Sequence, residues 1–166
     1  MTETGGFEMN FSIVPANHTH RNALADLMQF YIYDFSEFLG FDVEENGQYS
    51  PYPLDEYFEE GNRQFAYVIK REEKYAGFVL VRLIEDVGVR HYSIAEFFVL
   101  KKYRREGIGK AVAADIFSRH KGPWEVHQIE NNKGAQIFWK RAIDEYTKGR
   151  FEELVEDGKT IQTFVS

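Results

Sequence analysis

The sequence predicts a mixed α/β domain, because strand-like and helix-like patterns alternate along nearly the whole chain. Short apolar and aromatic runs predict the strands, and segments with apolar residues at helical spacing separate them. With 166 residues, 43% of them hydrophobic, the chain has enough apolar material for one ordinary core and too little for two comfortable domains. We therefore expect one domain over residues 1–166.

The helical segments are marked by one buried stripe each. In the first, Leu24, Leu27 and Met28 recur at the spacing of a helix with one apolar face, and Ile108 and Val112 do the same later in the chain. Helices are expected over residues 21–38, 54–60, 108–120 and 134–146.

The strands include two hairpins and one nearly continuous apolar run, residues 92–100, which only Glu96 interrupts. Charged turns at residues 71–74 and 156–159 join the hairpins. Strands are expected over residues 8–14, 65–69, 75–84, 92–100, 124–129, 151–155 and 160–165. The predicted order is β-α-α-β-β-β-α-β-α-β-β, with one long irregular segment at residues 40–53.

Composition excludes several classes of function. The sequence has no cysteine, which rules out disulfides, a thiolate zinc site and a cysteine nucleophile. The five histidines show no metal-ligand spacing, so we expect no metal. A net charge of -7 argues against nucleic-acid binding. Neither a signal peptide nor a run of about 20 apolar residues is visible, which indicates a cytoplasmic protein that does not associate with a membrane.

Charge is unevenly distributed along the chain. Five basic residues and one acid fall between Lys101 and Lys110, whereas residues 34–60 contain nine acids and no Lys or Arg. One small cationic spot and one acidic segment thus stand out, and each can attract a ligand of opposite charge.

The cationic spot coincides with glycines between a predicted strand and a predicted helix. Gly107 and Gly109 allow close backbone approach, and the helix that follows adds its partial positive charge, so the segment can cradle an anion. The alternative is an ordinary strand-to-helix turn with solvated cations. A P-loop is excluded by Arg104 and Ala111, and a dinucleotide fingerprint by Val112 at the third glycine position.

Two motifs resemble the GNAT superfamily of N-acetyltransferases. Residues 104–109, Arg-Arg-Glu-Gly-Ile-Gly, match the Arg/Gln-x-x-Gly-x-Gly/Ala pattern of that family, and they follow an apolar strand as the family requires. Residues 132–139 resemble its second signature, Asn-x-x-Ala-x-x-Phe-Tyr. The element order agrees over nearly the whole chain, and the likeness is closest to bacterial acetyltransferases of unassigned substrate.

This resemblance implies the GNAT fold, in which a mixed central sheet with flanking helices is splayed between two parallel strands, here residues 93–100 and 124–129. It also implies acetyl-CoA (coenzyme A) in the split, with its pyrophosphate on the backbone N–H groups of the glycine loop. Lys101 and Lys102 are either phosphate contacts or solvated charges. The cofactor-binding residues implied are Phe98, Val99, Leu100, Arg104, Arg105, Glu106, Gly107, Ile108, Gly109, Lys110, Asn132, Ala135, Phe138 and Trp139.

Catalysis by such an enzyme needs a group that takes the proton of the acceptor amine. Glu96 is the acid within the strand beside the cofactor, and burial would raise its pKa into a useful range. The alternative is a structural carboxylate held by Arg82 or Arg90. Trp139 occupies the position where the family often carries an acidic Tyr, so either Tyr146 donates the proton or the thiolate leaves without one; Trp139 itself lines the channel or packs in the core.

The acceptor site is expected on the acidic segment between the first two helices. We expect Tyr31, Phe35, Glu44 and Glu45 to bind the acceptor, because carboxylates and aromatic faces attract a cationic amine. The alternative is that these rings are core and these acids are solvated.

The function predicted is acetyl transfer from acetyl-CoA to a primary amine of a small molecule or peptide. The alternative function is a weakly catalytic acyl-CoA sensing module; either would be a monomer or a homodimer.

Overall fold

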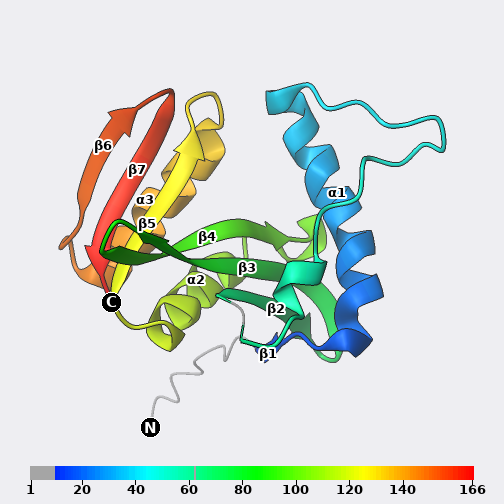
Figure 1. Cartoon of the computed structure of the whole chain (residues 1–166), viewed down its shortest axis with the longest axis horizontal. Coiled ribbons are helices and arrows are strands. Elements are labelled where there is room, and N and C mark those ends of the chain that lie inside the picture. Colours follow the sequence, from blue (N-terminus) through cyan, green and yellow to red (C-terminus); the bar gives the residue numbers. More distant parts are fainter. Residues whose placement is uncertain (1–9, 62) are drawn as a thin grey trace, which may run out of the picture.

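One mixed sheet runs through the molecule in the strand order β1-β2-β3-β4-β5-β7-β6 (Figure 1). The computed structural model describes residues 10–61 and 63–166. The strands are β1 (Phe11–Pro15), β2 (Gln64–Arg71), β3 (Lys74–Asp86), β4 (Val89–Val99), β5 (Pro123–Ile129), β6 (Glu152–Glu156) and β7 (Lys159–Val165). The helices are α1 (Arg21–Leu39), α2 (Ile108–Arg119) and α3 (Lys133–Thr147), with short 3₁₀ turns η1 (His18–His20), η2 (Asp55–Tyr57) and η3 (Lys101–Tyr103).

The mixed α/β fold class is confirmed, with two differences in its elements. The helix expected over residues 54–60 is a single 3₁₀ turn, because two helical turns alone are too few to stabilise an α-helix and because Leu54 and Tyr57, three residues apart, are both buried. Among the described residues the first strand begins at Phe11; residues 8 and 9, which the expected strand included, lie outside the part of the chain that the structure describes.

Each face of the sheet has its own core. On one face, Leu24 and Met28 of α1 pack against Phe78, Leu80 and Phe98. The other core lies against α2 and α3 and includes Val112, Phe117, Trp124, Trp139 and Ile143. The apolar stripes expected for these helices therefore face opposite sides of one sheet.

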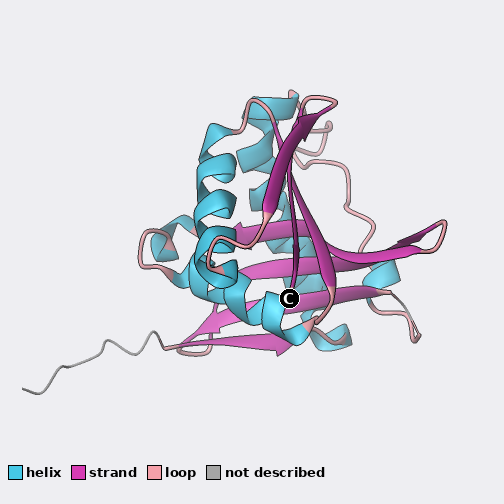
Figure 2. Ribbon diagram, turned by 90° about the vertical axis from the view of Figure 1, so that its left-hand side faces the viewer, coloured by secondary structure: helices cyan, strands magenta, loops and turns pink. Residues whose placement is uncertain are grey.

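The sheet splits after two residue pairs between its central parallel strands. β4 and β5 pair only at Tyr92 with Trp124 and at Ser93 with Glu125. In β4 a bulge follows, because Leu80 of β3 lies opposite Glu96 whereas Val81 lies opposite Ile94. A bulge increases local twist, and β5, β7 and β6 stand steeply across β1 to β4 (Figures 1 and 2). The edge of β4 beyond Ser93 thus faces β5 without pairing to it.

Gly77 of β3 is required by the close approach of β4. A Cβ atom at this position would lie 1.9 Å from the carbonyl oxygen of Phe98. That oxygen belongs to the backbone and cannot swing aside as a side chain can, so residue 77 must lack a side chain for β4 to keep its place.

We expect Gly77→Ala to lower the free energy of unfolding by more than about 3 kcal/mol, since the added methyl forces β3 and β4 apart. Chemical denaturation measures the loss. The control is Gly134→Ala in the first turn of α3, where a Cβ meets only Asn132 Oδ1 at 3.9 Å. That substitution should leave stability unchanged or raise it by up to about 1 kcal/mol. Equal effects of the two variants would contradict the packing argument.

Candidate active site

The segment before α2 has the backbone of an anion cradle. Arg105 and Gly107 both adopt positive φ, at 66° and 80°, and Gly107 is the N-cap of α2. The first hydrogen bond of the helix runs from Ala111 N to Gly107 O at 3.2 Å. The N–H groups of Ile108, Gly109 and Lys110 come before this bond and therefore have no acceptor within the helix. Unsatisfied N–H groups at a helix N-terminus attract phosphate.

The charged side chains around this cradle bind other parts of the protein. Arg104 donates to Val99 O at 2.7 Å and to Asp34 Oδ2 at 2.5 Å. Glu106 pairs with Arg71. Lys110 pairs with Glu145 at 2.7 Å. For Glu106 and Lys110 the backbone N–H groups therefore remain for the predicted cofactor contact, whereas the backbone N–H of Arg104 already donates to Lys101 O at 3.2 Å.

Gly109 permits close packing between α2 and α3. A Cβ at this position would lie 3.0 Å from the ring of Phe138. Phe138 contacts Phe97 of β4, with ring centroids 5.6 Å apart, and stays partly exposed. Trp139 is only 7% exposed and packs behind these rings against Phe117. This geometry favours the core role of Trp139 over the channel role.

The second signature begins with a helix cap. Asn132 is the N-cap of α3, and its side chain accepts a hydrogen bond from Ala135 N at 3.1 Å. The neighbouring Asn131 donates to Phe38 O at 3.0 Å and so joins the end of β5 to α1. The Asn-x-x-Ala spacing thus has a local structural cause, and cofactor contact by Asn132 and Ala135 stays a prediction.

Glu96 lies on the face of β4 that α1 covers. Tyr31 of α1 donates a hydrogen bond to Glu96 Oε2. Burial raises the pKa of Glu96 above its ordinary value, and hydrogen bonding by Tyr31 and Tyr52 partly opposes that rise. The structural alternative, a direct arginine partner, is not formed, because Arg82 donates to Tyr57 instead and Arg90 pairs with Glu85 at 3.4 Å.

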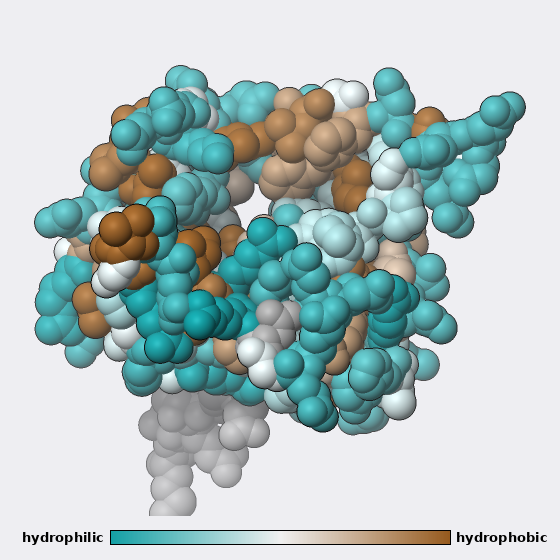
Figure 3. Space-filling model, in the orientation of Figure 1, coloured by the Kyte–Doolittle hydropathy of each residue, from teal (hydrophilic) through white to brown (hydrophobic). Residues whose placement is uncertain are grey.

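A cavity of about 390 Å³ opens beside Glu96. Its lining comes from α1, from the segment that follows it, and from β4: Tyr31, Ile32, Phe35, Leu39, Phe41, Asp42, Tyr49, Ser50, Pro51, Tyr52, Pro53 and Glu96. Apolar side chains gather at the end of α1, next to an opening in the surface toward β5 (Figure 3). Leu39 and Phe41, near this end of the helix, are each 48% exposed. The predicted acceptor residues Tyr31 and Phe35 meet here.

Glu44 and Glu45 do not line this cavity, so their predicted acceptor role is not supported. A turn with the hydrogen bond Gly47 N to Glu44 O, 2.8 Å, reverses the chain at this point. Ser50 donates to the Glu44 carboxylate, and Glu45 is exposed on the turn. The acid that does reach the cavity is Asp42. Its place in the acidic segment signalled it, but the sequence does not show which acids turn inward.

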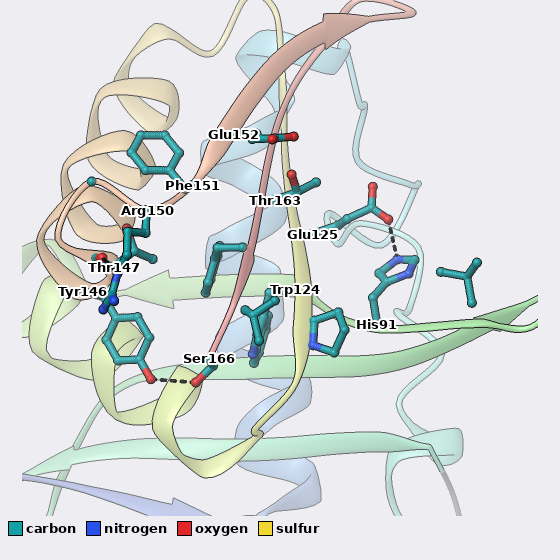
Figure 4. Close-up of a pocket in the computed structure, with 15 residues that line it drawn as sticks. His91, Trp124, Glu125, Tyr146, Thr147, Arg150, Phe151, Glu152, Thr163 and Ser166 are labelled. Carbon is teal, nitrogen blue, oxygen red and sulfur yellow. Dashed lines mark hydrogen bonds and ion pairs between the residues drawn. The ribbon is translucent and has the colours of Figure 1, made fainter.

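Tyr146 lies at the end of the split away from Glu96, which favours the alternative in which the thiolate leaves without an acid. Its hydroxyl bonds Ser166 Oγ at 2.6 Å, and Ser166 also pairs with the backbone of Gly122 just before β5. α3 runs back from the open end of the split, so its last turn reaches the end where β4 and β5 still pair. Tyr146 lines a separate pocket there, beside Thr147 and across from His91 (Figure 4).

The profile of the acetyltransferase (GNAT) family matches residues 26–143, more than half of the chain. The chain belongs to this family. Among curated protein sequences none matches. The GNAT fold is shared with solved structures of low sequence identity.

An acetyltransferase from Thermus thermophilus superposes with a TM-score of 0.65 at 12% identity, over 95% of this chain and 97% of the other. The Bacillus subtilis acetyltransferase in complex with CoA gives 0.59 at 16% identity, over 94% and 99%. Arabidopsis thaliana NAA60 in complex with acetyl-CoA gives 0.61 at 14% identity, over 93% and 98%. Identities of this size show a common fold.

Two further findings bear on the expected absences. No helix among the described residues is long and apolar enough to cross a membrane. Within residues 10–61 and 63–166, no group of three or more His, Cys, Asp or Glu is arranged to hold a metal ion.

Glu96 should cost stability at neutral pH. Its pKa is raised on folding, so the folded state holds this proton more tightly than the unfolded state, and stability falls as pH rises from about 4.5 through the raised pKa. We therefore expect Glu96→Gln to raise Tm at pH 7 and to have little effect at pH 4. Glu45→Gln, at an exposed turn, is the control and should shift Tm at neither pH. A Glu96→Gln protein with a lower Tm at pH 7 would show that its ionised carboxylate stabilises the fold.

Proposed function

We propose that this GNAT protein transfers the acetyl group of acetyl-CoA to a primary amine on a cationic small molecule or peptide. The observation that carries the proposal is Glu96, a half-buried carboxylate on the splayed strand, which faces an aromatic cavity. The same strand leads through residues 100–107 to the anion cradle of α2. The proposed sites for acetyl-CoA and for the acceptor amine therefore both lie along β4.

The residues present fit acetyl-CoA. The cradle offers the N–H groups of Ile108, Gly109 and Lys110 to a pyrophosphate, and the unpaired edge of β4 offers backbone groups to the amides of the pantetheine arm. The Bacillus subtilis neighbour holds CoA and NAA60 holds acetyl-CoA on the same fold. When bound, the cofactor supplies a thioester whose acetyl group an amine can attack.

Glu96 would prepare the amine for attack. An alkyl ammonium has a pKa of about 10.4 and must lose a proton before its lone pair is free. The raised pKa of Glu96 reduces the difference between its pKa and that of the amine. The Tyr31 hydroxyl holds Oε2 in place. In this step an N–H bond of the ammonium breaks and an O–H bond forms on Glu96.

Val99 would stabilise the oxyanion that forms on the acetyl carbonyl. Leu100 N bonds Ala76 O of β3 at 2.8 Å. Because successive N–H groups of a strand point to opposite sides, the N–H of Val99 points toward the open split. An N–H group fixed in this direction can donate to the developing negative charge. The thiolate, with a pKa of about 8.5 for a free thiol, can then leave without an acid.

The cavity favours a cationic acceptor. Its charged lining residues are Asp42 and Glu96, and its lining holds no Lys or Arg. Aromatic rings surround the space, and each well-placed cation–π contact contributes about 0.5 to 2 kcal/mol. A neutral or anionic acceptor gains neither effect.

Release of the CoA thiol from acetyl-CoA, followed over a panel of amines, tests the proposal directly. We expect turnover with diamines and lysine-like amines, and a lower kcat for Glu96→Gln with unchanged CoA affinity. No turnover with any amine, together with tight acetyl-CoA binding, would favour the sensing module; the burial of Trp139 and the remote place of Tyr146 are the observations on its side.

Gly107→Glu should abolish CoA binding, because it places a side chain and a negative charge in the cradle. Isothermal titration with CoA measures the effect. The matched control is Gly158→Glu in the β6–β7 turn, which imposes the same charge at a similar positive φ of 71° with open space around it. The control should bind CoA as the wild type does. Wild-type affinity in a folded Gly107→Glu protein would refute the cradle assignment.

Asp42→Asn should raise KM for a cationic amine by up to about fivefold, since it removes an exposed charge that lines the cavity. KM of the wild type should also rise with ionic strength. Glu45→Gln changes the same charge a few residues away, outside the cavity, and should leave KM nearly unchanged. Equal effects of both variants would mean that only the overall charge of the segment matters.

A further inference from the structure

The apolar stripe of α1 continues past the core into which its first half packs. Leu24 and Met28 are buried against the sheet, whereas Leu39, on the same face of the helix in its last turn, is 48% exposed. Within the described part of the chain, neither core includes Phe35 or Leu39. The last two turns of the stripe therefore line the cavity beside Glu96 instead of packing in the protein interior.

This stripe gives the cavity an inner end and an outer end. Tyr31, whose hydroxyl donates to Glu96, marks the inner end. Leu39 lies two helical turns further along the same face, which is about 12 Å away along the helix axis. Phe35 lies between them, with its ring centroid 4.9 Å from that of Tyr31. The wall thus changes from a carboxylate and a tyrosine at the inner end to an aliphatic side chain at the outer end.

The segment after α1 forms the opposite wall and is tied to the helix. The side chain of Gln29 accepts a hydrogen bond from Tyr49 N at 2.8 Å and donates one to Tyr49 O at 3.1 Å. Pro51 and Pro53 follow closely, and their rings restrict the backbone. The cavity is therefore formed before a ligand enters, and its lining can select among acceptors.

Most of the lining is carbon. Six of the twelve lining residues have no polar side-chain atom: Ile32, Phe35, Leu39, Phe41, Pro51 and Pro53. Ser50 already donates to Glu44, which is not part of the lining. Asp42 is exposed, so it attracts a cation only weakly through water. One ammonium group therefore finds a half-buried carboxylate at Glu96, and the rest of the same molecule meets an apolar wall.

We propose that the acceptor is a primary amine with a single charge and an apolar body, an alkylamine or arylalkylamine whose ammonium reaches Glu96 and whose body extends toward Leu39. The inference rests on the proposed acetyl transfer and narrows its acceptor. The volume of about 390 Å³ suits a small molecule, since ligand pockets measure about 300 to 1,000 Å³. An apolar body is stabilised by burial against this wall, whereas a second ammonium there would lose water without gaining a partner.

The transfer balances with such an acceptor. A C–N bond to the amine replaces the C–S bond of the thioester. The ammonium gives up two protons, one to Glu96 and one to the departing sulfur or to water. The product is a neutral amide, which has lost the only charge that Glu96 attracted.

The test compares two amines of equal size. Hexylamine and cadaverine have the same number of non-hydrogen atoms and differ at the far end, which is a methyl group in one and a second ammonium in the other. Both should be acetylated by the full chain, and kcat/KM from CoA thiol release should be at least about tenfold higher for hexylamine. From propylamine to hexylamine, kcat/KM should rise by up to about fourfold for each buried methylene.

Leu39→Glu should shift this preference toward cadaverine. It removes apolar contact from the outer end and offers a carboxylate to a second ammonium. The ratio of kcat/KM for hexylamine to that for cadaverine should fall by about tenfold. The matched control is Phe30→Glu, which makes the same kind of change at an exposed apolar side chain of α1 that does not line the cavity. The control should keep the wild-type ratio.

The outcomes separate this inference from the function on which it rests. If cadaverine reacts as well as hexylamine, or if kcat/KM does not rise with chain length, the apolar acceptor is overturned and acetyl transfer stands. If no amine of the series reacts although CoA binds, acetyl transfer is overturned and the inference with it. Equal changes of the ratio in Leu39→Glu and Phe30→Glu also overturn the inference. If Leu39→Glu fails to fold, the wild-type ratio and the chain-length series decide.

Discussion

The divergence of β4 from β5 is the constraint on which the rest of the structure depends. Two residue pairs hold the parallel strands together, and the bulge opposite Leu80 and Val81 then turns β4 away. The strand beyond the bulge keeps its bonds to β3 on one side only. Backbone groups that a regular sheet would satisfy internally are left facing the split, where a ligand with amides can pair with them. The close approach permitted by Gly77 keeps β4 fixed on its bonded side.

Helix α1 is tied to this splayed strand at two positions one turn apart. Tyr31 bonds Glu96, and Asp34 bonds Arg104, whose Nε in turn bonds the carbonyl of Val99. The first tie belongs to the acceptor cavity and the second to the loop before α2. One helix therefore contacts both the cavity beside Glu96 and the loop before α2, so any shift of α1 would alter the two together. Among the charged side chains of the loop, this tie to α1 accounts for the position of Arg104.

At Glu96 the proposed chemistry requires an ionised carboxylate whose burial lowers the stability of the fold. A half-buried carboxylate is unfavourable when ionised, and the hydroxyl of Tyr31 from α1 donates a hydrogen bond to it. Hydroxyls stabilise the charge without cancelling it, so the carboxylate can still accept a proton. A direct ion pair with Arg82 would lower the pKa of Glu96 and make it a weaker base. The fold instead directs Arg82 onto Tyr57.

The sequence by itself determined the fold class, most of the element order and the place of the glycine loop between a strand and a helix, because these depend on local periodicity and on motifs whose residues are close together in the chain. It also marked residues 34–60 as unusual, yet it could not tell that Asp42 faces the cavity whereas Glu44 and Glu45 face solvent, since a turn at Gly47 decides their directions. The sequence could not show at which end of the split Tyr146 lies, because the direction of α3 relative to the split is a tertiary property. The hydrogen-bond partner of Glu96 is Tyr31, which is 65 residues away in the sequence, and only the packing of α1 onto one face of the sheet brings its hydroxyl to the carboxylate.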